Sequence, residues 1–388
     1  MRRVWGDFSM PGVRMQTTMK SLAPPLQQID RTYVWYRDRK LSYFGGCDYF
    51  RLSSHRLVVT ALQLGLKRYG LTVAASRKTT GNHALYEKLE QRLADFFAVT
   101  DTVLLSNGYT TNLVVAQTLA GNFSHVLLDE RAHASLVDAA VFFGCSILRF
   151  PSRDADALAR LVRGIGPRSR PVLLTEGMFS HDGELAPIKA YLRVLPRNAL
   201  VLLDDVHGAG VLGKTGKGTA EHLRVRSNRI IQSVSLGKAF GVYGGAVLGP
   251  RTLCERIRKR SRLFGGNTPL PLPLINAALQ AVQIMKSDKS LRRRLEENTS
   301  YVKRGLRQAG LPLGGTPSPI IALTPRRAAG ARKLSGHLLA QQVFGSFIRY
   351  PDSTARGSYR FAISSEHSIE QLELLVRTLS EHRDYILK

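Results

Sequence analysis

Lys238, Asp204 and His207 are the residues of this sequence that could do chemistry together. Asp204 and His207 follow an apolar run at 199–203, and Lys238 follows a second apolar run, 34 positions after Asp204. Such runs predict buried strands. A lysine amine can form a Schiff base with an aldehyde, and a carboxylate can keep a pyridine nitrogen protonated so that the ring accepts electrons. The three side chains therefore predict a pyridoxal phosphate site.

Other polar groups follow other predicted strands. The segment 106–111 opens a helix, so its N–H groups and hydroxyls could hold a phosphate, and Tyr109 could flank a ring. His133 stands at a further helix start, where a lone histidine is more often a cap or a core residue. Ser180 lies in a polar run after a fourth strand. Parallel sheets bind ligands at the carboxyl ends of their strands, so we expect these groups to converge.

Strands and helices alternate through most of the chain. Helices are predicted at 57–69, 84–97, 111–119, 133–143, 155–162 and 187–195, and strands at 103–105, 126–128, 147–150, 172–175, 200–203, 230–234 and 244–248. This alternation is typical of an α/β fold with a mostly parallel sheet.

The pattern of apolar residues changes after Pro273. Predicted helices at 274–285 and 291–308 precede short strands at 320–323, 346–349 and 359–363, and a last helix begins with a capping box at Ser368 and Gln371. We therefore predict an N-terminal arm (1–44), a large cofactor-binding domain (45–285) and a small α+β C-terminal domain (286–388).

Composition limits the class of protein. The chain has 388 residues, of which 44% are apolar, and can form one large core or two domains. No apolar stretch reaches the ~18 residues of a membrane helix, and no secretory signal is visible, although the Arg-rich start leaves a transit peptide as a minority alternative. Cys47, Cys145 and Cys254 are too far apart for a metal site and odd in number. We predict a cytoplasmic protein without a bound metal.

The net charge of +27 comes from 56 basic and 29 acidic residues. It indicates either a generally basic surface or attraction to an anionic partner such as coenzyme A, an acidic acyl carrier protein or nucleic acid. The densest basic runs, 256–262 and 292–294, lack the interleaved aromatic residues on which single-stranded nucleic acids stack. Nucleic acid is therefore the least favoured of these partners.

One glycine-rich segment matches two sequence patterns of nucleotide-binding loops. Residues 208–215 match both G-x-G-x-x-G and G-x-x-x-x-G-K-T. Both motifs need a strand directly before the first glycine and a helix directly after the last residue. The residues 204–207 separate this segment from its strand, and Gly216 and Gly218 discourage a helix. We interpret the segment as a glycine loop beside an active site.

The sequence resembles the α-oxoamine synthases, a family within the fold-type I, class II aminotransferase-like pyridoxal phosphate enzymes. The resemblance runs from about residue 41 to the C-terminus, and it is specific at five segments: 106–109, 129–135, 175–183, 204–213 and 235–241. Within the family, the 8-amino-7-oxononanoate synthases are the most similar at 204–210. The resemblance implies a fold-type I transferase and a homodimer with shared active sites.

The resemblance also implies a role for each matched residue. Lys238 would carry the Schiff base and act as general base, Asp204 would pair with the ring nitrogen, and His207 would bond the ring hydroxyl. His133 would stack on the ring. Gly108, Tyr109 and Ser235 would lie around the phosphate, and Ser180 would lie near the ring hydroxyl. Arg360 would bind the carboxylate of the amino-acid substrate. The partner subunit's Asn267 and Thr268 would add further contacts to the phosphate.

The implied reaction is a decarboxylative condensation of a small amino acid with an acyl thioester, which yields an α-amino ketone, coenzyme A and CO2. L-Alanine and a pimeloyl thioester of coenzyme A or an acyl carrier protein, the biotin route, are favoured, and glycine or serine as the amino acid stays open. Two departures bear on the substrate. Residues 71–77 stand where the family has a glycine-rich stretch, and Cys47 replaces an asparagine.

Two other functions stay open. One is a pyridoxal phosphate aminotransferase or lyase without acyl transfer, which would release no thiol. The other is a basic nucleic-acid-binding protein on a degenerate enzyme scaffold, and the intact Lys238, Asp204 and His207 argue against it.

Overall fold

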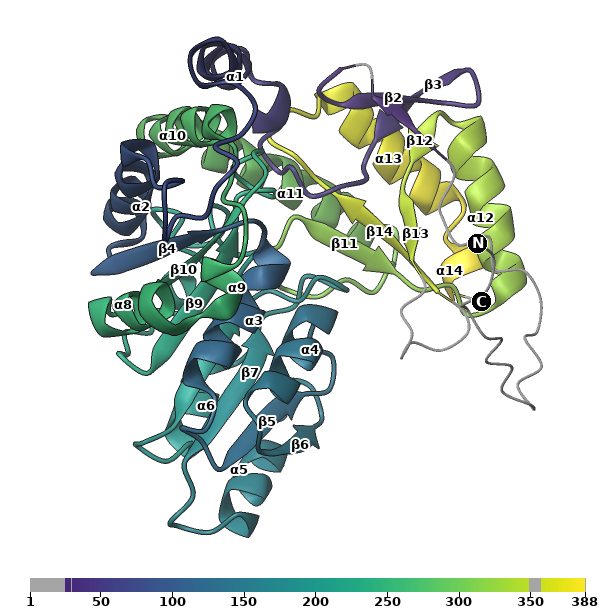
Figure 1. Ribbon diagram of the computed structural model, residues 1–388. Coiled ribbons are helices and arrows are strands. Elements are labelled where there is room, and N and C mark those ends of the chain that lie inside the picture. Colours follow the sequence, from purple (N-terminus) through teal and green to yellow (C-terminus); the bar gives the residue numbers. More distant parts are fainter. Residues whose placement is uncertain (1–24, 29, 349–356, 388) are drawn as a thin grey trace, which may run out of the picture.

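The main sheet of the protein has seven strands. The computed structural model describes residues 25–28, 30–348 and 357–387, and Figure 1 shows its architecture. The strands lie in the order β4-β10-β9-β8-β7-β5-β6. Their bounds are β4 Asp101–Leu105, β5 His125–Asp129, β6 Ser146–Phe150, β7 Pro171–Glu176, β8 Leu200–Asp204, β9 Ile230–Ser235 and β10 Gly245–Gly249. All neighbours are parallel except β10, which is antiparallel to β4 and β9. The predicted α/β fold with a mostly parallel sheet is confirmed.

Helices cover both faces of this sheet. Side chains alternate along each strand, so Val126 and Leu128 pack with one group of helices while Leu127 packs with another. The first group is α3 Gly108–Leu119, α4 Ala134–Phe142, α8 Arg251–Arg260 and α9 Arg262–Gly265; the second is α5 Ala155–Gly164 and α6 Ile188–Val194. A third cluster joins α1 Arg56–Tyr69, α2 Ala84–Phe97 and α10 Leu272–Ser287 to β9 and β10. Burial on both faces explains why the strands read as continuous apolar runs.

The C-terminal part packs beside the large sheet (Figure 1). Its antiparallel sheet has the order β11-β14-β13. The elements are α11 Ser290–Gln308, β11 Ile320–Leu323, α12 Ala328–Ala340, β12 Val343–Phe344, β13 Ser346–Ile348, β14 Ser358–Ala362, α13 Ile369–Glu381 and α14 Asp384–Leu387. The predicted capping box is present, because Gln371 N–H donates to Ser368 Oγ at 3.3 Å and Ser368 N–H donates to Gln371 Oε1 at 3.1 Å.

The described part of the predicted N-terminal arm also forms strands. β1 Gln27–Gln28, β2 Tyr33–Tyr36 and β3 Arg39–Tyr43 make a four-stranded sheet with β12 of the C-terminal part. Residues 1–24 of the arm and Arg349 of the predicted strand 346–349 lie outside the described residues. The domain boundaries themselves stay a prediction.

Several elements were not predicted, among them the β2–β3 hairpin, α8 and α12. In α8 the buried side chains are only Leu253, Cys254 and Ile257, so the basic residues between them obscure its helical period. No helix in the described ranges is long and apolar enough to cross a membrane.

Candidate active site

Asp204 ends β8 near the centre of the sheet, and its side chain is buried at 2% exposure. Asn112 Nδ2 donates to Asp204 Oδ2 at 2.6 Å, and Val206 N–H donates to Oδ1 at 3.2 Å. Burial raises the pKa of Asp204, while the bond from Asn112 and the charges of His133 and Lys238 oppose that rise. A buried carboxylate is costly unless a cation or donors compensate it, so this position suits a cationic ligand group.

Asn112 is a site residue that the sequence did not reveal. It lies on α3 with a fully buried side chain. Besides Asp204, its amide donates to Ser135 Oγ at 2.9 Å, and its Oδ1 accepts from Ser233 Oγ at 2.6 Å. One amide thus fixes the Asp204 carboxylate to α4 and β9. The available signal was an asparagine inside an otherwise apolar helix face.

His207 is held by Tyr49, a second residue that was not predicted. The Tyr49 hydroxyl and His207 Nδ1 are 2.7 Å apart. Burial lowers the pKa of His207 well below its usual value, and the charges of Lys238 and Arg360 add to this effect. The imidazole is therefore neutral near pH 7, and its bond to Tyr49 leaves Nε2 for a ligand.

Lys238 lies in the turn after β9, half-buried. The positive charge of Lys238 lowers the pKa of both His207 and Asp204. Because such an effect requires proximity, the fold brings the three predicted residues together. Among the described residues, none forms a hydrogen bond or ion pair with Lys238 Nζ. The amine is therefore available to an incoming carbonyl group.

The N-terminus of α3 meets the end of β9. Gly108 is the first residue of α3, and a Cβ at this position would lie 2.9 Å from the Cβ of Ser235. Asn267 Nδ2 donates to Ser106 Oγ at 3.3 Å, and Thr268 lines the same small cavity. Backbone N–H groups at a helix N-terminus favour an anion, and only glycine leaves room beside Ser235. Asn267 thus lies near the N-terminus of α3 of its own chain, whereas the family resemblance predicts that it contacts the phosphate bound by the partner subunit.

His133, whose charge acts on Asp204, has Tyr109 as an aromatic neighbour. His133 caps α4, because Ser135 N–H donates to its Nδ1 at 3.2 Å. Its ring meets the ring of Tyr109 edge-on with centroids 6.0 Å apart. The Tyr109 hydroxyl donates to Asp138, and this bond raises the pKa of Tyr109 to about 12. The histidine is thus a helix cap and also part of the aromatic wall of the site.

Arg360 joins the C-terminal sheet to the site. It stands in β14, and its Nη1 donates to the carbonyl of Ser180 at 3.1 Å. Its Nη2 lies 3.7 Å from Cys47 Sγ. Ser180 N–H in turn donates to Glu176 Oε2 at 2.9 Å. A guanidinium therefore lies beside the loop that carries Ser180, where it could bind a carboxylate.

The comparisons with known proteins agree with this geometry. A family model for aminotransferase class I and II matches residues 48–379. A putative 8-amino-7-oxononanoate synthase of Desulforudis audaxviator is 33% identical and covers 92% of this chain and 93% of its own length. The chain belongs to the class I and II aminotransferase family, in its α-oxoamine synthase branch.

Two solved structures extend the similarity of this α-oxoamine synthase. A structure of serine palmitoyltransferase (SPT) with pyridoxal phosphate has a TM-score of 0.87 at 25% identity, with 92% of this chain and 90% of the other covered. The 8-amino-7-oxononanoate synthase of Francisella tularensis has a TM-score of 0.77 at 25% identity, with 89% and 98% covered.

The segment 71–77, which departs from the glycine-rich family pattern, is held by a buried arginine. Arg77 donates to Glu90 at 2.6 and 3.2 Å, and its guanidinium lies 4.8 Å from the ring of Tyr86 and 5.6 Å from that of Phe264. Ala74 has φ 49°, the left-handed region that glycine adopts without strain. In this α-oxoamine synthase, the segment is thus anchored by a buried ion pair.

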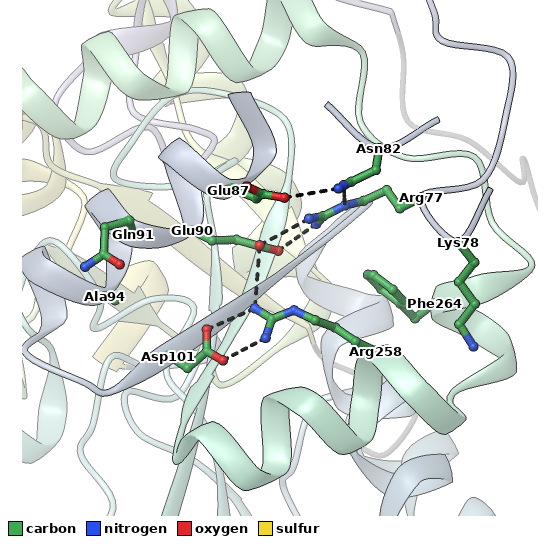
Figure 2. A pocket seen from close by; sticks show the side chains of 10 residues that line it. All are labelled: Arg77, Lys78, Asn82, Glu87, Glu90, Gln91, Ala94, Asp101, Arg258 and Phe264. Atoms are coloured by element: carbon green, nitrogen blue, oxygen red, sulfur yellow. Dashed lines mark hydrogen bonds and ion pairs between the residues drawn. The ribbon is translucent and has the colours of Figure 1, made fainter. Parts of the chain in front are cut away.

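Figure 2 shows how this anchor continues into a charge network around a cavity of about 460 Å³. Arg258 of α8 binds Asp101 at 2.7 Å and approaches Glu90 at 3.5 Å. The two arginines, Arg77 and Arg258, thus balance two carboxylates, and Glu90 also accepts from Leu104 N–H at 3.0 Å. A network with all its charges paired is structural rather than a ligand site.

The glycine loop 208–218 is anchored by Asp205, the residue after Asp204. This carboxylate accepts from Thr219 N–H and from Gln232 Nε2, both at 2.8 Å, and burial raises its pKa to about 7. A helix begins only at Thr219, after Gly218. The geometry that a nucleotide loop needs is therefore missing at residues 208–215, as predicted. In the part of the chain that the structure describes, no cluster of acids, histidines and cysteines could hold a metal.

Proposed function

We propose that this protein condenses a small amino acid with an acyl thioester, with release of the thiol and CO2, and so forms an α-amino ketone. It is a pyridoxal phosphate enzyme of the α-oxoamine synthase branch. The observation that carries the proposal is the unpaired amine of Lys238 beside the buried carboxylate of Asp204. An amine and a carboxylate in this relation serve an aldehyde cofactor with a basic ring nitrogen.

The residues fit this cofactor at each of its polar groups. Asp204 is buried and forms no ion pair with a described residue, and the absence of a Cβ at Gly108 leaves space against Ser235 at the start of α3. Asp204 would hold the ring nitrogen, Lys238 the aldehyde carbon, His207 the ring hydroxyl, and the N-terminus of α3 the phosphate. When bound, pyridoxal phosphate supplies a ring that accepts the electron pair left on the α-carbon of the amino acid.

Residues of the chain would then transfer the α-proton and orient the substrate and the cofactor ring. Lys238 Nζ would take the α-proton and later return a proton to the same carbon after CO2 has left. Arg360 would bind the substrate carboxylate and align it for departure. His133 would cover one face of the ring and exclude water there. Asp204 would stay ionised because the cationic ring nitrogen offsets the cost of its burial.

The favoured substrates are L-alanine and a pimeloyl thioester, a choice supported by the similarity to proteins named 8-amino-7-oxononanoate synthase. A second candidate pairs serine or glycine with another acyl donor. The observation that favours it is the higher TM-score with SPT, 0.87 against 0.77. Cys47, which stands where the family resemblance implies an asparagine, lies 3.7 Å from Arg360, and we propose that this contact affects the choice of substrate.

We further propose a cytoplasmic enzyme that forms a homodimer, with the segment that carries Asn267 and Thr268 at the subunit interface; within one chain, Asn267 already donates to Ser106 Oγ. The family resemblance supports the dimer. Cross-linking followed by mass spectrometry tests it, because a cross-link between differently isotope-labelled chains near residue 267 requires two subunits.

Titration of the holoenzyme with amino acids tests the reaction. L-Alanine should shift the visible absorption band, and addition of a pimeloyl thioester should then release free thiol. The matched panel exchanges alanine for glycine and serine and varies the acyl chain. Absence of a spectral shift with all three amino acids would overturn the proposal, and conversion of the amino acid to an oxo acid without thiol release would make the enzyme an aminotransferase.

A further inference from the structure

A second charged groove lies apart from Lys238, between α11, the loop 314–317 and α7, which spans Thr219–His222. It has a volume of about 720 Å³. Lys303, Arg304 and Arg307 line it, and among its described lining residues Glu296 is the one carboxylate. The groove therefore carries a net positive charge.

Lys303 is the buried cation of this groove, with 6% exposure. Its Nζ donates to the carbonyl of Thr316 at 2.8 Å, and no carboxylate of the described residues lies within ion-pair distance. Glu184 attracts it from a distance but is bound by Arg153 at 3.3 Å. Burial, together with the charge of Arg307, lowers the pKa of Lys303 to about 8. Buried lysines are normally paired, so this one lacks an anion.

Thr299 supplies an independent sign of a missing ligand. It lies one helical turn before Lys303 on α11, is buried at 3% exposure and lines the same groove. Its hydroxyl has no hydrogen-bond partner among the described residues. A buried hydroxyl without a partner costs free energy, and rotation of the side chain toward the groove would let an acceptor oxygen there recover it.

We propose that this groove binds a phosphate ester or pyrophosphate group, with Lys303 and Thr299 at its floor and Arg304 and Arg307 at its rim. Arginine forks match phosphate oxygens in pairs, and a lysine adds a point charge. Two sources share this chemistry: the phosphorylated tail of a coenzyme A thioester and a free phosphorylated metabolite.

The groove shares a wall with the active-site loop. Thr316, whose carbonyl holds Lys303, donates from its Oγ1 to the carbonyl of Gly183 at 3.1 Å. Gly183 lies three positions after Ser180, which contacts Arg360. An anion bound to Lys303 would therefore be linked, through Thr316 and Gly183, to the loop that carries Ser180.

Calorimetric titration of the holoenzyme with inorganic pyrophosphate tests the site, because bound cofactor then fills its own phosphate position. The double variant Arg304→Ala/Arg307→Ala and the buried variant Lys303→Met should each raise the Kd about tenfold or more. Arg293→Ala is the matched control, since Arg293 lies on the same helix, is exposed and does not line the groove. Absence of pyrophosphate binding by the wild type, or equal Kd values in all variants, would overturn the proposal.

Kinetics with two donors separate the two sources. The same acyl group is presented on coenzyme A and on N-acetylcysteamine, which carries no phosphate. If the donor tail occupies the groove, the Arg304→Ala/Arg307→Ala variant raises KM about tenfold for the first donor and leaves the second unchanged. If a free metabolite occupies it, both KM values stay unchanged while pyrophosphate binding is lost. Because the titration needs no turnover, it stands even where the proposed reaction fails.

Discussion

Replacement of Asn112 by leucine tests whether this buried amide keeps Asp204 ionised. Asn112→Leu removes the donated bonds to Asp204 and Ser135 and strands the hydroxyl of Ser233. A hydrogen bond to a charged group contributes about 1.5–3 kcal/mol, and a stranded buried hydroxyl costs about 1–3 kcal/mol. We therefore expect a loss of about 3–5 kcal/mol in unfolding free energy. The part lost at the carboxylate raises the pKa of Asp204 further, because the bond from Asn112 favours the ionised form.

Absorbance titration of the apoprotein with pyridoxal phosphate over a range of pH measures this rise. The carboxyl group of Asn112→Leu keeps its proton to higher pH, so cofactor affinity should fall about tenfold or more and most strongly at the acid end. Ser233→Ala is the graded control, because it leaves both donors to Asp204 and Ser135 in place. A folded Asn112→Leu protein with the wild-type Kd and pH profile would refute the reasoning.

Three further predictions concern the phosphate end, the anchor and a buried acid. Gly108→Ala should weaken pyridoxal phosphate binding in an absorbance titration, because its Cβ meets β9, whereas Gly164→Ala, which meets open space, should not. Arg77→Leu should lower the unfolding free energy by about 3 kcal/mol in a denaturant titration, because Glu90 loses a buried partner; Arg293→Ala, which breaks an exposed pair, should leave it nearly unchanged. Burial and Asp204 raise the pKa of Glu176, so its contribution to stability is complete below the ordinary value and is lost as the pH rises through the raised one. Glu176→Gln should therefore gain unfolding free energy relative to wild type as the pH rises above 4.5, the ordinary pKa of this carboxyl.

Each of these predictions has an opposite outcome that would count against it. Equal cofactor affinity in Gly108→Ala would mean that the phosphate does not approach α3. Equal losses in Arg77→Leu and Arg293→Ala would remove the case for a buried anchor. A pH-independent difference for Glu176→Gln would mean that this carboxyl is ionised in the folded protein.

The fold was largely predictable because the sheet is buried on both faces. Its strands, such as 200–203 and 230–234, are continuous apolar runs between helices, and this pattern requires parallel neighbours. The reversed direction of β10 was not predictable, since strand direction depends on the path of the chain and leaves no mark on side-chain periodicity. In α8 the basic residues needed at the surface obscured the helical period.

The site was predictable where chemistry and position coincide. Lys238, Asp204 and His207 follow strands, and strand ends of a parallel sheet meet at one edge. Asn112 and Tyr49 escaped prediction because each acts on another side chain rather than on a ligand. Such partners are fixed by packing between distant segments, which one sequence does not display.

The route of the polypeptide through the site has a consequence for its biogenesis. Arg360 belongs to β14, near the end of the chain, while the sheet that carries Lys238 is complete by β10. Because N-terminal segments emerge from the ribosome first, a nascent chain can form the sheet that carries Lys238 before Arg360 has been synthesised. The strand end that would hold the cofactor is therefore made before the arginine that would bind the substrate carboxylate.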